Sequence, residues 1–275
     1  VPTCPHLLTL FLNNDDLLRI INRRINTDFL QSMPSLKVLN LSRYMGLLEL
    51  PSGISKLVSL EHLDLSTTLI REIPEDLKAL VNLKCLNLEN AGFLFKIPLQ
   101  LVSNFSRLRV LRMFGTGYFS CGLYPEDSVL FGGGELLVKE LLHLKHLEVL
   151  SLTFGSSRAL QSFLNSHKLR SCTQALLLQD FEGSTSVDVS GLADLKRLKR
   201  LRISDCYELV ELKIDYAGEV QRYGFHSLQS FEVSFCSKLK DLTLLVLIPN
   251  LKSIAVTDCK AMEEIISVGE FAGNP

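Results

Sequence analysis

The chain has 275 residues, of which 47% are hydrophobic and 21% are charged, and its formal net charge is −1 at pH 7. A charge balance this close to neutral argues against bulk binding of polyanions, so we expect no nucleic-acid partner. No apolar run approaches the roughly 20 residues that span a bilayer, and no signal peptide is recognisable at the start. We expect a cytoplasmic protein without a membrane span, held at a membrane only through the rest of a longer protein.

Cysteine usage agrees with a reducing compartment. The chain has seven cysteines, which is an odd number, and no C-x-x-C pair. This pattern suits free thiols better than a disulfide framework.

One spacing of apolar residues recurs along most of the chain. Leu60, Leu63 and Leu65 form the pattern L-x-x-L-x-L, and Leu83 begins the same pattern 23 residues later. Ten strands are predicted at such spacings, and their first positions are Leu7, Leu36, Leu60, Leu83, Leu108, Leu147, Thr173, Leu198, Leu228 and Leu251. This period and spacing are typical of the leucine-rich repeat, in which each unit holds one short strand and a return segment.

The spacing has a physical cause. Side chains alternate between the two faces of a strand, so the second and third apolar residues of each pattern point to the same side. One unit cannot bury this row alone, whereas stacked units form a continuous core and a parallel ladder. The predicted fold is therefore an α/β leucine-rich-repeat solenoid, or horseshoe, with about ten parallel strands on its concave face. Loops or short helices form its convex face.

The segments between the strands read as turns and short helices. Leu50 to Leu57 reads as a turn followed by a short helical return, and Glu75–Leu80 and Leu99–Phe105 look alike. Glu135 to Leu144 reads as a further helix that leads back to the strand beginning at Leu147.

The period breaks between Leu108 and Leu147, where the spacing rises to 39 residues. The extra chain is an irregular insert at 115–134 that carries four aromatic residues and ends in Gly132-Gly133-Gly134. Its glycines predict a mobile joint. In the alternative, its aromatic side chains pack on the neighbouring repeat. We otherwise expect one domain, 1–275, that is a fragment of a longer protein.

The last three units share a cysteine eight residues after their first position. These residues are Cys206, Cys236 and Cys259. One interpretation is that the three thiols bind a metal ion or take part in redox chemistry. The simpler interpretation is that a small thiol fits where the strand turns away and donates to a backbone carbonyl. We predict that all three are buried, reduced and free of metal.

Function is expected on the concave face, because the residues that alternate with the strand leucines point there. The central row of this face is predicted to be Phe11, Asn40, Asp64, Asn87, Arg112, Ser151, Leu177, Arg202, Glu232 and Ala255. The first half of this row is polar to acidic, and Arg112 introduces a positive charge. A solvated surface explains these charges too, since Lys and Arg are common outside any core.

A second basic cluster lies around one late strand. Lys196, Arg197 and Lys199 precede Arg200 and Arg202. Arg202 and Glu232 occupy one column of adjacent units, which predicts an exposed ion pair that contributes about 0–1 kcal/mol to stability. The protein-binding hypothesis therefore names six residues: Asp64, Asn87, Arg112, Arg200, Arg202 and Glu232.

No catalytic constellation is recognisable, so we expect no enzyme activity, no cofactor and no metal in this chain. There is no phosphate-binding loop, no H-E-x-x-H and no calcium-loop pattern. His143 and His146 are three residues apart, but no further ligand completes a convincing site.

The repeats resemble a known family. The stretch LPSGISKLVSLEHLDLSTTLIREIPEDLKALVNLKCLNLEN and the late SDC, SFC and TDC units are similar to the repeats of plant intracellular nucleotide-binding leucine-rich-repeat (NLR) disease resistance proteins of the coiled-coil type. This resemblance implies a C-terminal repeat domain of an innate immune receptor. It implies that a coiled coil and an ATP/ADP-binding domain lie upstream. It also implies that the repeats hold the nucleotide-binding domain inactive by intramolecular contact and sense a pathogen effector or a guarded host protein.

Two other classes stay open. A secreted receptor ectodomain would also bind ligands on its concave face, but a signal peptide and paired cap cysteines are expected of it. A ubiquitin-ligase adaptor built on repeats would need an adjoining motif outside this chain.

Overall fold

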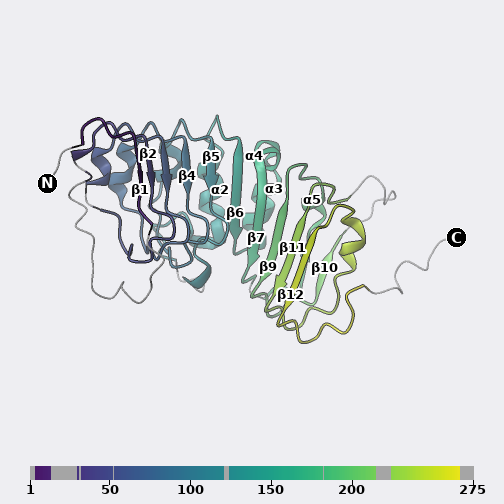
Figure 1. Cartoon of the computed structure of the whole chain (residues 1–275). Coiled ribbons are helices and arrows are strands. Elements are labelled where there is room, and N and C mark those ends of the chain that lie inside the picture. Colours follow the sequence, from purple (N-terminus) through teal and green to yellow (C-terminus); the bar gives the residue numbers. More distant parts are fainter. Residues whose placement is uncertain are drawn as a thin grey trace. The chain divides into compact units, whose positions relative to one another are not determined.

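The computed structural model describes residues 4–13, 30, 32–51, 53–120, 124–181, 183–214 and 224–266. The chain divides into two compact units, Val1–Thr153 and Phe154–Pro275. In both units, short strands alternate with return segments (Figure 1).

The first unit is built on a ladder of short strands. They are β1 (Thr9–Phe11), β2 (Val38–Asn40), β3 (His62–Asp64), β4 (Cys85–Asn87), β5 (Val110–Arg112) and β6 (Val149–Phe154). Each strand pairs in parallel with the next one along the sequence. The return segments carry η3 (Ile54–Lys56), η4 (Glu75–Ala79), α1 (Leu101–Asn104), η5 (Tyr118–Ser120), η6 (Phe131–Gly134) and α2 (Glu135–Leu141).

The second unit repeats this plan with longer strands. They are β7 (Thr173–Gln179), β9 (Arg200–Ser204), β11 (Ser230–Ser234) and β12 (Ser253–Thr257), and again neighbours pair in parallel. A separate two-stranded sheet joins β8 (Ser186–Asp188) to β10 (Glu211–Lys213). The helices are α3 (Ser157–Leu164), α4 (His167–Cys172), α5 (Ser190–Ala193) and η7 (Thr243–Leu247).

The ladder strands of the two units number six and four, which confirms the ten predicted from the sequence. The predicted return helices are confirmed too, although the helix expected to end at Leu144 ends at Leu141. Sequence analysis did not predict α3 and α4. Each is preceded by an N-cap serine whose hydroxyl accepts a backbone N–H. Ser156 accepts the N–H of Ala159, and Ser166 accepts the N–H of Leu169.

The degenerate seventh repeat is explained by a hydrogen bond. Thr173 stands where the other repeats have a leucine, and its side chain is fully buried. Its hydroxyl donates to the Leu169 carbonyl of α4 at 2.7 Å. This bond satisfies the buried hydroxyl, so a polar residue is accommodated in the core.

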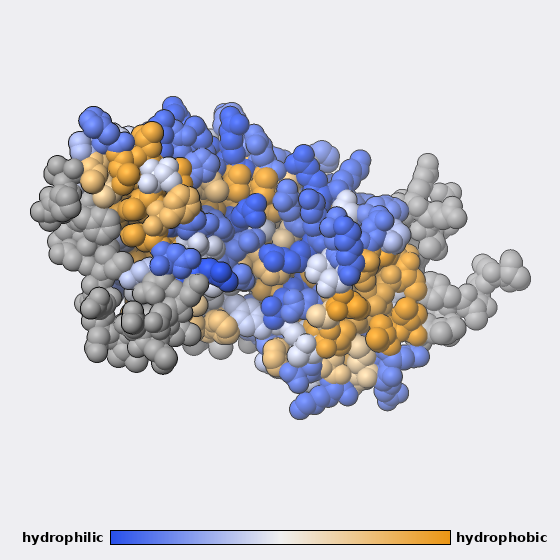
Figure 2. Space-filling model, in the orientation of Figure 1, coloured by the Kyte–Doolittle hydropathy of each residue, from blue (hydrophilic) through white to orange (hydrophobic). Residues whose placement is uncertain are grey.

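The interior repeats bury their apolar triads, as predicted. Leu63 and Leu86 are 1% and 2% exposed. The expectation that every triad is buried is wrong for both end repeats. Leu7, Leu10 and Leu12 of the first repeat are only partly buried, and Ile254 and Val256 of the last repeat are 43% and 39% exposed. A repeat is covered by the two repeats beside it, and β12 pairs only with β11 among the described strands. Figure 2 shows the resulting hydrophobic surface over the C-terminal part of the second unit.

The insert is packed rather than loose over its described residues. Gly117 N–H donates to the Ala91 carbonyl and Phe119 N–H donates to the Gly92 carbonyl, at 3.1 and 2.8 Å. The Phe119 ring stacks on Phe93 with 5.0 Å between centroids. These contacts favour the alternative, in which the aromatic side chains of the insert pack on the neighbouring repeat, whereas the mobility of the insert stays a prediction.

Two glycines permit this packing. A Cβ on Gly92 would lie 2.6 Å from the Phe119 ring. Gly117 has φ +73°, and a Cβ there would lie 2.6 Å from the Tyr124 hydroxyl oxygen. The glycines therefore allow close approach of the insert to its neighbour.

The end of the insert is fixed by a buried serine. Ser128 is fully buried, and its hydroxyl accepts the Ile97 N–H at 3.1 Å and donates to the Phe95 carbonyl at 3.3 Å. Lys96 and Asp127 form an ion pair at 2.6 Å beside it. This hydrogen bond from Lys96 is the main cause that lowers the pKa of Asp127.

Beyond the insert, α2 stabilises the start of α1. Glu140 of α2 is 8% exposed, and its carboxylate accepts the backbone N–H groups of Gln100 and Ser103. These donors lie in the first turn of α1, where backbone N–H groups have no partner within the helix. Sequence analysis gave Glu140 no role.

Candidate protein-binding face

The outward residues of the ladder strands lie in the register that the sequence predicted. Within the first unit, Asn40 pairs with Asp64, Asp64 with Asn87, and Asn87 with Arg112. Within the second, Leu177 pairs with Arg202 and Arg202 with Glu232. We call the outward side of these strands the strand face.

The acidic and amide residues of the first unit have structural partners. Asp64 Oδ1 accepts the Ser66 N–H at 2.9 Å, and Asn87 Oδ1 accepts the Glu89 N–H at 3.1 Å. Asn87 Nδ2 also donates to Asp64 Oδ2 at 3.0 Å. These bonds hold the turns that follow β3 and β4. A role of Asp64 and Asn87 in binding a partner stays a prediction.

Arg112 brings a positive charge into the polar row of the first unit. It is exposed, and its register partners are Asn87 and Ser151. Because a guanidinium in this position can reach a carboxylate on another protein, its predicted binding role stays open.

A second charged row precedes the strands, which sequence analysis missed. Glu61 lies between Lys37 and Lys84, with Nζ-to-carboxylate distances of 3.6 and 2.5 Å. The hydrogen bond from Lys84 lowers the pKa of Glu61. All three occupy the second position of their repeats, which is the signal that identifies them. Lys37 is therefore part of an ion-pair row that crosses the repeats.

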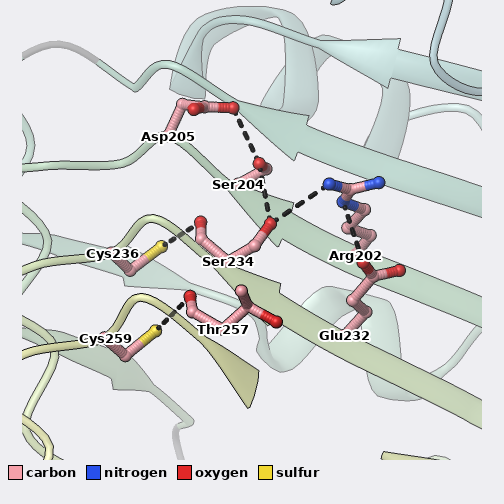
Figure 3. Close-up of polar contacts among 8 residues, drawn as sticks. All are labelled: Arg202, Ser204, Asp205, Glu232, Ser234, Cys236, Thr257 and Cys259. Atoms are coloured by element: carbon pink, nitrogen blue, oxygen red, sulfur yellow. Dashed lines mark hydrogen bonds and ion pairs between the residues drawn. The ribbon is translucent and has the colours of Figure 1, made fainter. Parts of the chain in front are cut away.

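The predicted Arg202–Glu232 pair is present in the second unit. Arg202 Nε lies 3.5 Å from Glu232 Oε1, and the two side chains are 24% and 36% exposed. Figure 3 shows that the guanidinium also turns toward the neighbouring serine of β11, where Nη2 donates to Ser234 Oγ at 3.2 Å.

This second contact opens a chain of hydrogen bonds. The hydroxyl oxygens of Ser234 and Ser204 lie 2.9 Å apart, and Ser204 Oγ donates to Asp205 Oδ2 at 2.7 Å (Figure 3). Because Ser204 donates to Asp205, Ser234 must donate to Ser204, and Arg202 then donates to Ser234. The chain runs in one donor direction, from a cation to a carboxylate, through two serines that are at most 2% exposed.

The network changes the expected role of Arg202. Sequence analysis predicted only an exposed pair of slight energetic effect. The guanidinium instead donates to the buried hydroxyl of Ser234, which in turn donates to Ser204, and a hydrogen bond to a charged group is worth about 1.5–3 kcal/mol. Arg202 is therefore a structural residue as well as part of the strand face, and reversing its charge disturbs the fold.

Arg200 has a different setting on the same strand. Its register partners are the small residues Ala175 and Ser230. Lys196, Arg197 and Lys199, which lead into β9, are exposed. The predicted basic cluster is thus assembled around the start of β9, with Arg200 on the strand face.

The strand face is not evenly available to a partner. Leu177 is fully buried and Ser151 is 3% exposed, although both belong to the predicted central row. Phe11 at β1 is 64% exposed. Sequence spacing predicted which side these residues face, whereas their exposure depends on the bulk of the side chains around them.

The late cysteines occupy equivalent positions. Cys206 and Cys236 are buried and donate to the Ser204 and Ser234 carbonyls at 3.3 and 3.5 Å, as the simpler interpretation predicted. Burial of Cys259 is a wrong prediction, because this residue is only partly buried. The hydrogen bond with Cys206 and burial raise the pKa of Cys236. The six described cysteines are free thiols.

Metal chemistry finds no support in the described ranges, where no group of three or more His, Cys, Asp or Glu side chains could hold an ion. His143 Nδ1 hydrogen-bonds to the Lys139 carbonyl at 3.0 Å. Among the same residues, no helix has the length and apolar character needed to cross a bilayer.

Comparison with known proteins decides the family. A family model described as "Leucine-rich repeat region" matches residues 4–271. The chain belongs to this leucine-rich repeat family. A solved leucine-rich repeat protein of Leptospira interrogans aligns with 75% of the chain and 57% of its own length, at 19% identity and a TM-score of 0.44.

Curated relatives of this leucine-rich repeat chain come from Arabidopsis thaliana. A probable disease resistance protein is 35% identical over 270 residues, which cover 96% of this chain and 29% of that protein. Disease resistance protein RPS5 is 35% identical over 96% of this chain and 28% of its own length. Disease resistance protein SUMM2 is 36% identical over 97% of this chain and 28% of its own length. The chain thus spans less than a third of these relatives. The predicted resemblance to the repeats of plant disease resistance proteins is confirmed.

Proposed function

We propose that this chain is the protein-interaction region of a plant disease resistance receptor that acts in the cytoplasm. The likeness to disease resistance proteins along 96–97% of the chain supports this assignment. In such a receptor the repeats would contribute to effector recognition and to restraint of an upstream ATP/ADP-binding domain.

The observation that carries the choice of surface is the basic cluster at β9. Arg200 lies on the strand face in register with Ala175 and Ser230, and the exposed cations Lys196, Arg197 and Lys199 precede it in the chain. Guanidinium groups suit carboxylate-rich surfaces, and complementary charge contributes to specificity and to the rate of association. The proposed contact is therefore an acidic surface, either on the receptor's own nucleotide-binding domain or on an effector or guarded host protein.

The experiment is charge reversal at Arg200 in the full-length receptor. Arg200→Glu retains the Arg202 network, so the melting temperature should stay close to that of the wild type. Signalling should change: activity without an effector indicates an autoinhibitory contact, and loss of the response indicates contact with an effector or guarded protein.

The matched control is Lys240→Glu. Lys240 is exposed in the same unit, and its N–H donates to the Val210 carbonyl beside β10, away from the strand face. If both variants signal like the wild type at equal protein levels, the basic cluster is only a solvated surface.

A further inference from the structure

In the first unit, the second position of three successive repeats carries a lysine, a glutamate and a lysine. The N–H of Glu61 donates to the Lys37 carbonyl at 2.8 Å, and the N–H of Lys84 donates to the Glu61 carbonyl at 2.7 Å. At this spacing the Glu61 carboxylate lies 3.6 Å from one ammonium group and 2.5 Å from the other. One anion on the middle repeat therefore pairs with a lysine on each side.

The second unit repeats this arrangement without the anion. The N–H of Gln229 donates to the Lys199 carbonyl at 2.9 Å, and the N–H of Lys252 donates to the Gln229 carbonyl at 2.8 Å. Two exposed lysines thus flank a partly exposed neutral amide at the same repeat position. Among the described residues, neither lysine forms an ion pair. We call these three residues the open triplet.

The surroundings of the open triplet carry no acidic residue. The three repeats contribute the segments 196–200, 226–230 and 249–253, and none of these segments contains Asp or Glu. One residue further along each strand, Arg200, Ser230 and Ser253 lie in register on the strand face. Ser253 is exposed and Ser230 is partly exposed. The surface therefore combines three cations with hydroxyl and amide donors and has no carboxylate to balance them.

This set of donors indicates which anion fits. A carboxylate has two oxygens and one negative charge, and in the first unit it pairs with two lysines. A phosphorylated serine or threonine has three strong acceptor oxygens and a charge of about −1.5 to −2 at pH 7. Lysine, arginine, serine and glutamine side chains all donate to phosphate oxygens. The greater charge and the third oxygen suit a surface with more donors than a carboxylate can accept.

We propose that the open triplet binds a phosphorylated serine or threonine on a protein segment. The binding residues are Lys199, Gln229, Lys252, Ser230 and Ser253. This inference rests on the proposed protein-binding function of the strand face and names the chemical class of its partner. The phosphate occupies the place that the glutamate holds in the first unit, so the partner supplies the anion that the chain lacks.

The test is an NMR titration of the isotope-labelled 275-residue chain with an acetylated, amidated heptapeptide of glycine and alanine around one phosphoserine. Saturable shifts are expected at the amides of the open triplet, Ser230 and Ser253, and binding should weaken with added salt. The same peptide with an unmodified serine should produce no shift at these amides. The peptide with glutamate at the centre should bind about two- to fivefold more weakly, the scale of one exposed ion pair.

Variants identify the residues that bind. Gln229→Glu supplies the anion from within the chain, so it should retain or raise the melting temperature and weaken phosphopeptide binding about tenfold, the scale of two exposed ion pairs. Lys199→Gln and Lys252→Gln should each weaken binding about two- to fivefold. The matched control is Lys240→Gln, an exposed position away from the strand face, which should leave binding unchanged.

Three results would overturn the proposal. The first is the absence of saturable shifts at these amides. The second is a glutamate peptide that binds as tightly as the phosphopeptide, since the site would then be one for carboxylates. The third is wild-type binding by a folded Gln229→Glu chain. If Gln229→Glu lowers the melting temperature, the double variant Lys199→Gln/Lys252→Gln decides, and wild-type binding by that chain would contradict the site.

Failure of this site and failure of the proposed function give different results. If the phosphopeptide does not bind but Arg200→Glu still alters signalling in the full-length receptor, the strand face contacts an unphosphorylated acidic partner. In that case only the phosphate site is refuted.

Discussion

Replacing Arg202 with methionine tests the hydrogen-bond chain of the second unit. Methionine keeps an unbranched apolar stem and removes the guanidinium. The change loses the bond to Ser234 Oγ at 3.2 Å and the ion pair to Glu232 at 3.5 Å. A hydrogen bond to a charged group contributes about 1.5–3 kcal/mol, and the long distance favours the lower value. The partly exposed pair adds about 0–1 kcal/mol.

We therefore expect Arg202→Met to lower the free energy of unfolding by about 1.5–2.5 kcal/mol in urea denaturation. Double-mutant cycles show how much of this lost stability comes from each contact of Arg202. Coupling of Arg202 to Ser234, measured with Ser234→Ala, should exceed coupling to Glu232, measured with Glu232→Gln. The control is Lys240→Met at an exposed position of the same unit, which should stay within about 0.5 kcal/mol of the wild type.

The reasoning fails if Arg202→Met unfolds like the wild type, because the two buried serines would then need no cationic donor. It also fails if the coupling to Glu232 is the larger one, since an exposed pair would then carry the stability.

Three further predictions concern the core, a helix terminus and a thiol. Leu86→Ala should cost about 2–5 kcal/mol in urea denaturation, whereas Ile254→Ala at the exposed end strand should cost clearly less, and equal losses would contradict the account of the core. Glu140→Gln should cost about 1–3 kcal/mol, since one of two N–H donors at α1 loses its acceptor, and a neutral result would dismiss this role. Burial raises the pKa of Cys172 to about 11. The thiol therefore stabilises the fold below the unfolded pKa of about 8.5, and this contribution is lost as pH rises toward about 11. Cys172→Ala should flatten the fall in melting temperature over this range, and an unchanged slope would refute the assignment.

The sequence was informative where the repeat itself dictates geometry. Strand alternation and the leucine spacing predicted the ladder and the pairing of Arg202 with Glu232, because both depend on a period of two along each strand. The same reasoning could not predict that Arg202 also supplies a buried serine pair. The hydrogen-bond partner of a guanidinium depends on its side-chain torsion angles and on the other hydrogen bonds of Ser204 and Ser234, and sequence spacing specifies neither.

Exposure was less predictable than direction. Leu177 and Phe11 both lie on the strand face, yet one is buried and the other is open to solvent. The glycines of the insert predicted a mobile joint. Gly92 and Gly117 instead permit close approach of Phe119 and Tyr124, which composition alone does not distinguish.

The most direct test of the proposed protein-binding face is site-specific photo-cross-linking in the purified full-length receptor. A photoreactive residue at Ser230, the register partner of Arg200, reports what covers the strand face at this point. If the contact is autoinhibitory, we expect a cross-link to an acidic segment of the nucleotide-binding domain. If the contact is with an effector, we expect a cross-link to the added acidic effector. Arg200→Glu should abolish it. A Ser230 position that cross-links no more than Lys240, or a cross-link that persists in the Arg200→Glu receptor, would contradict the account.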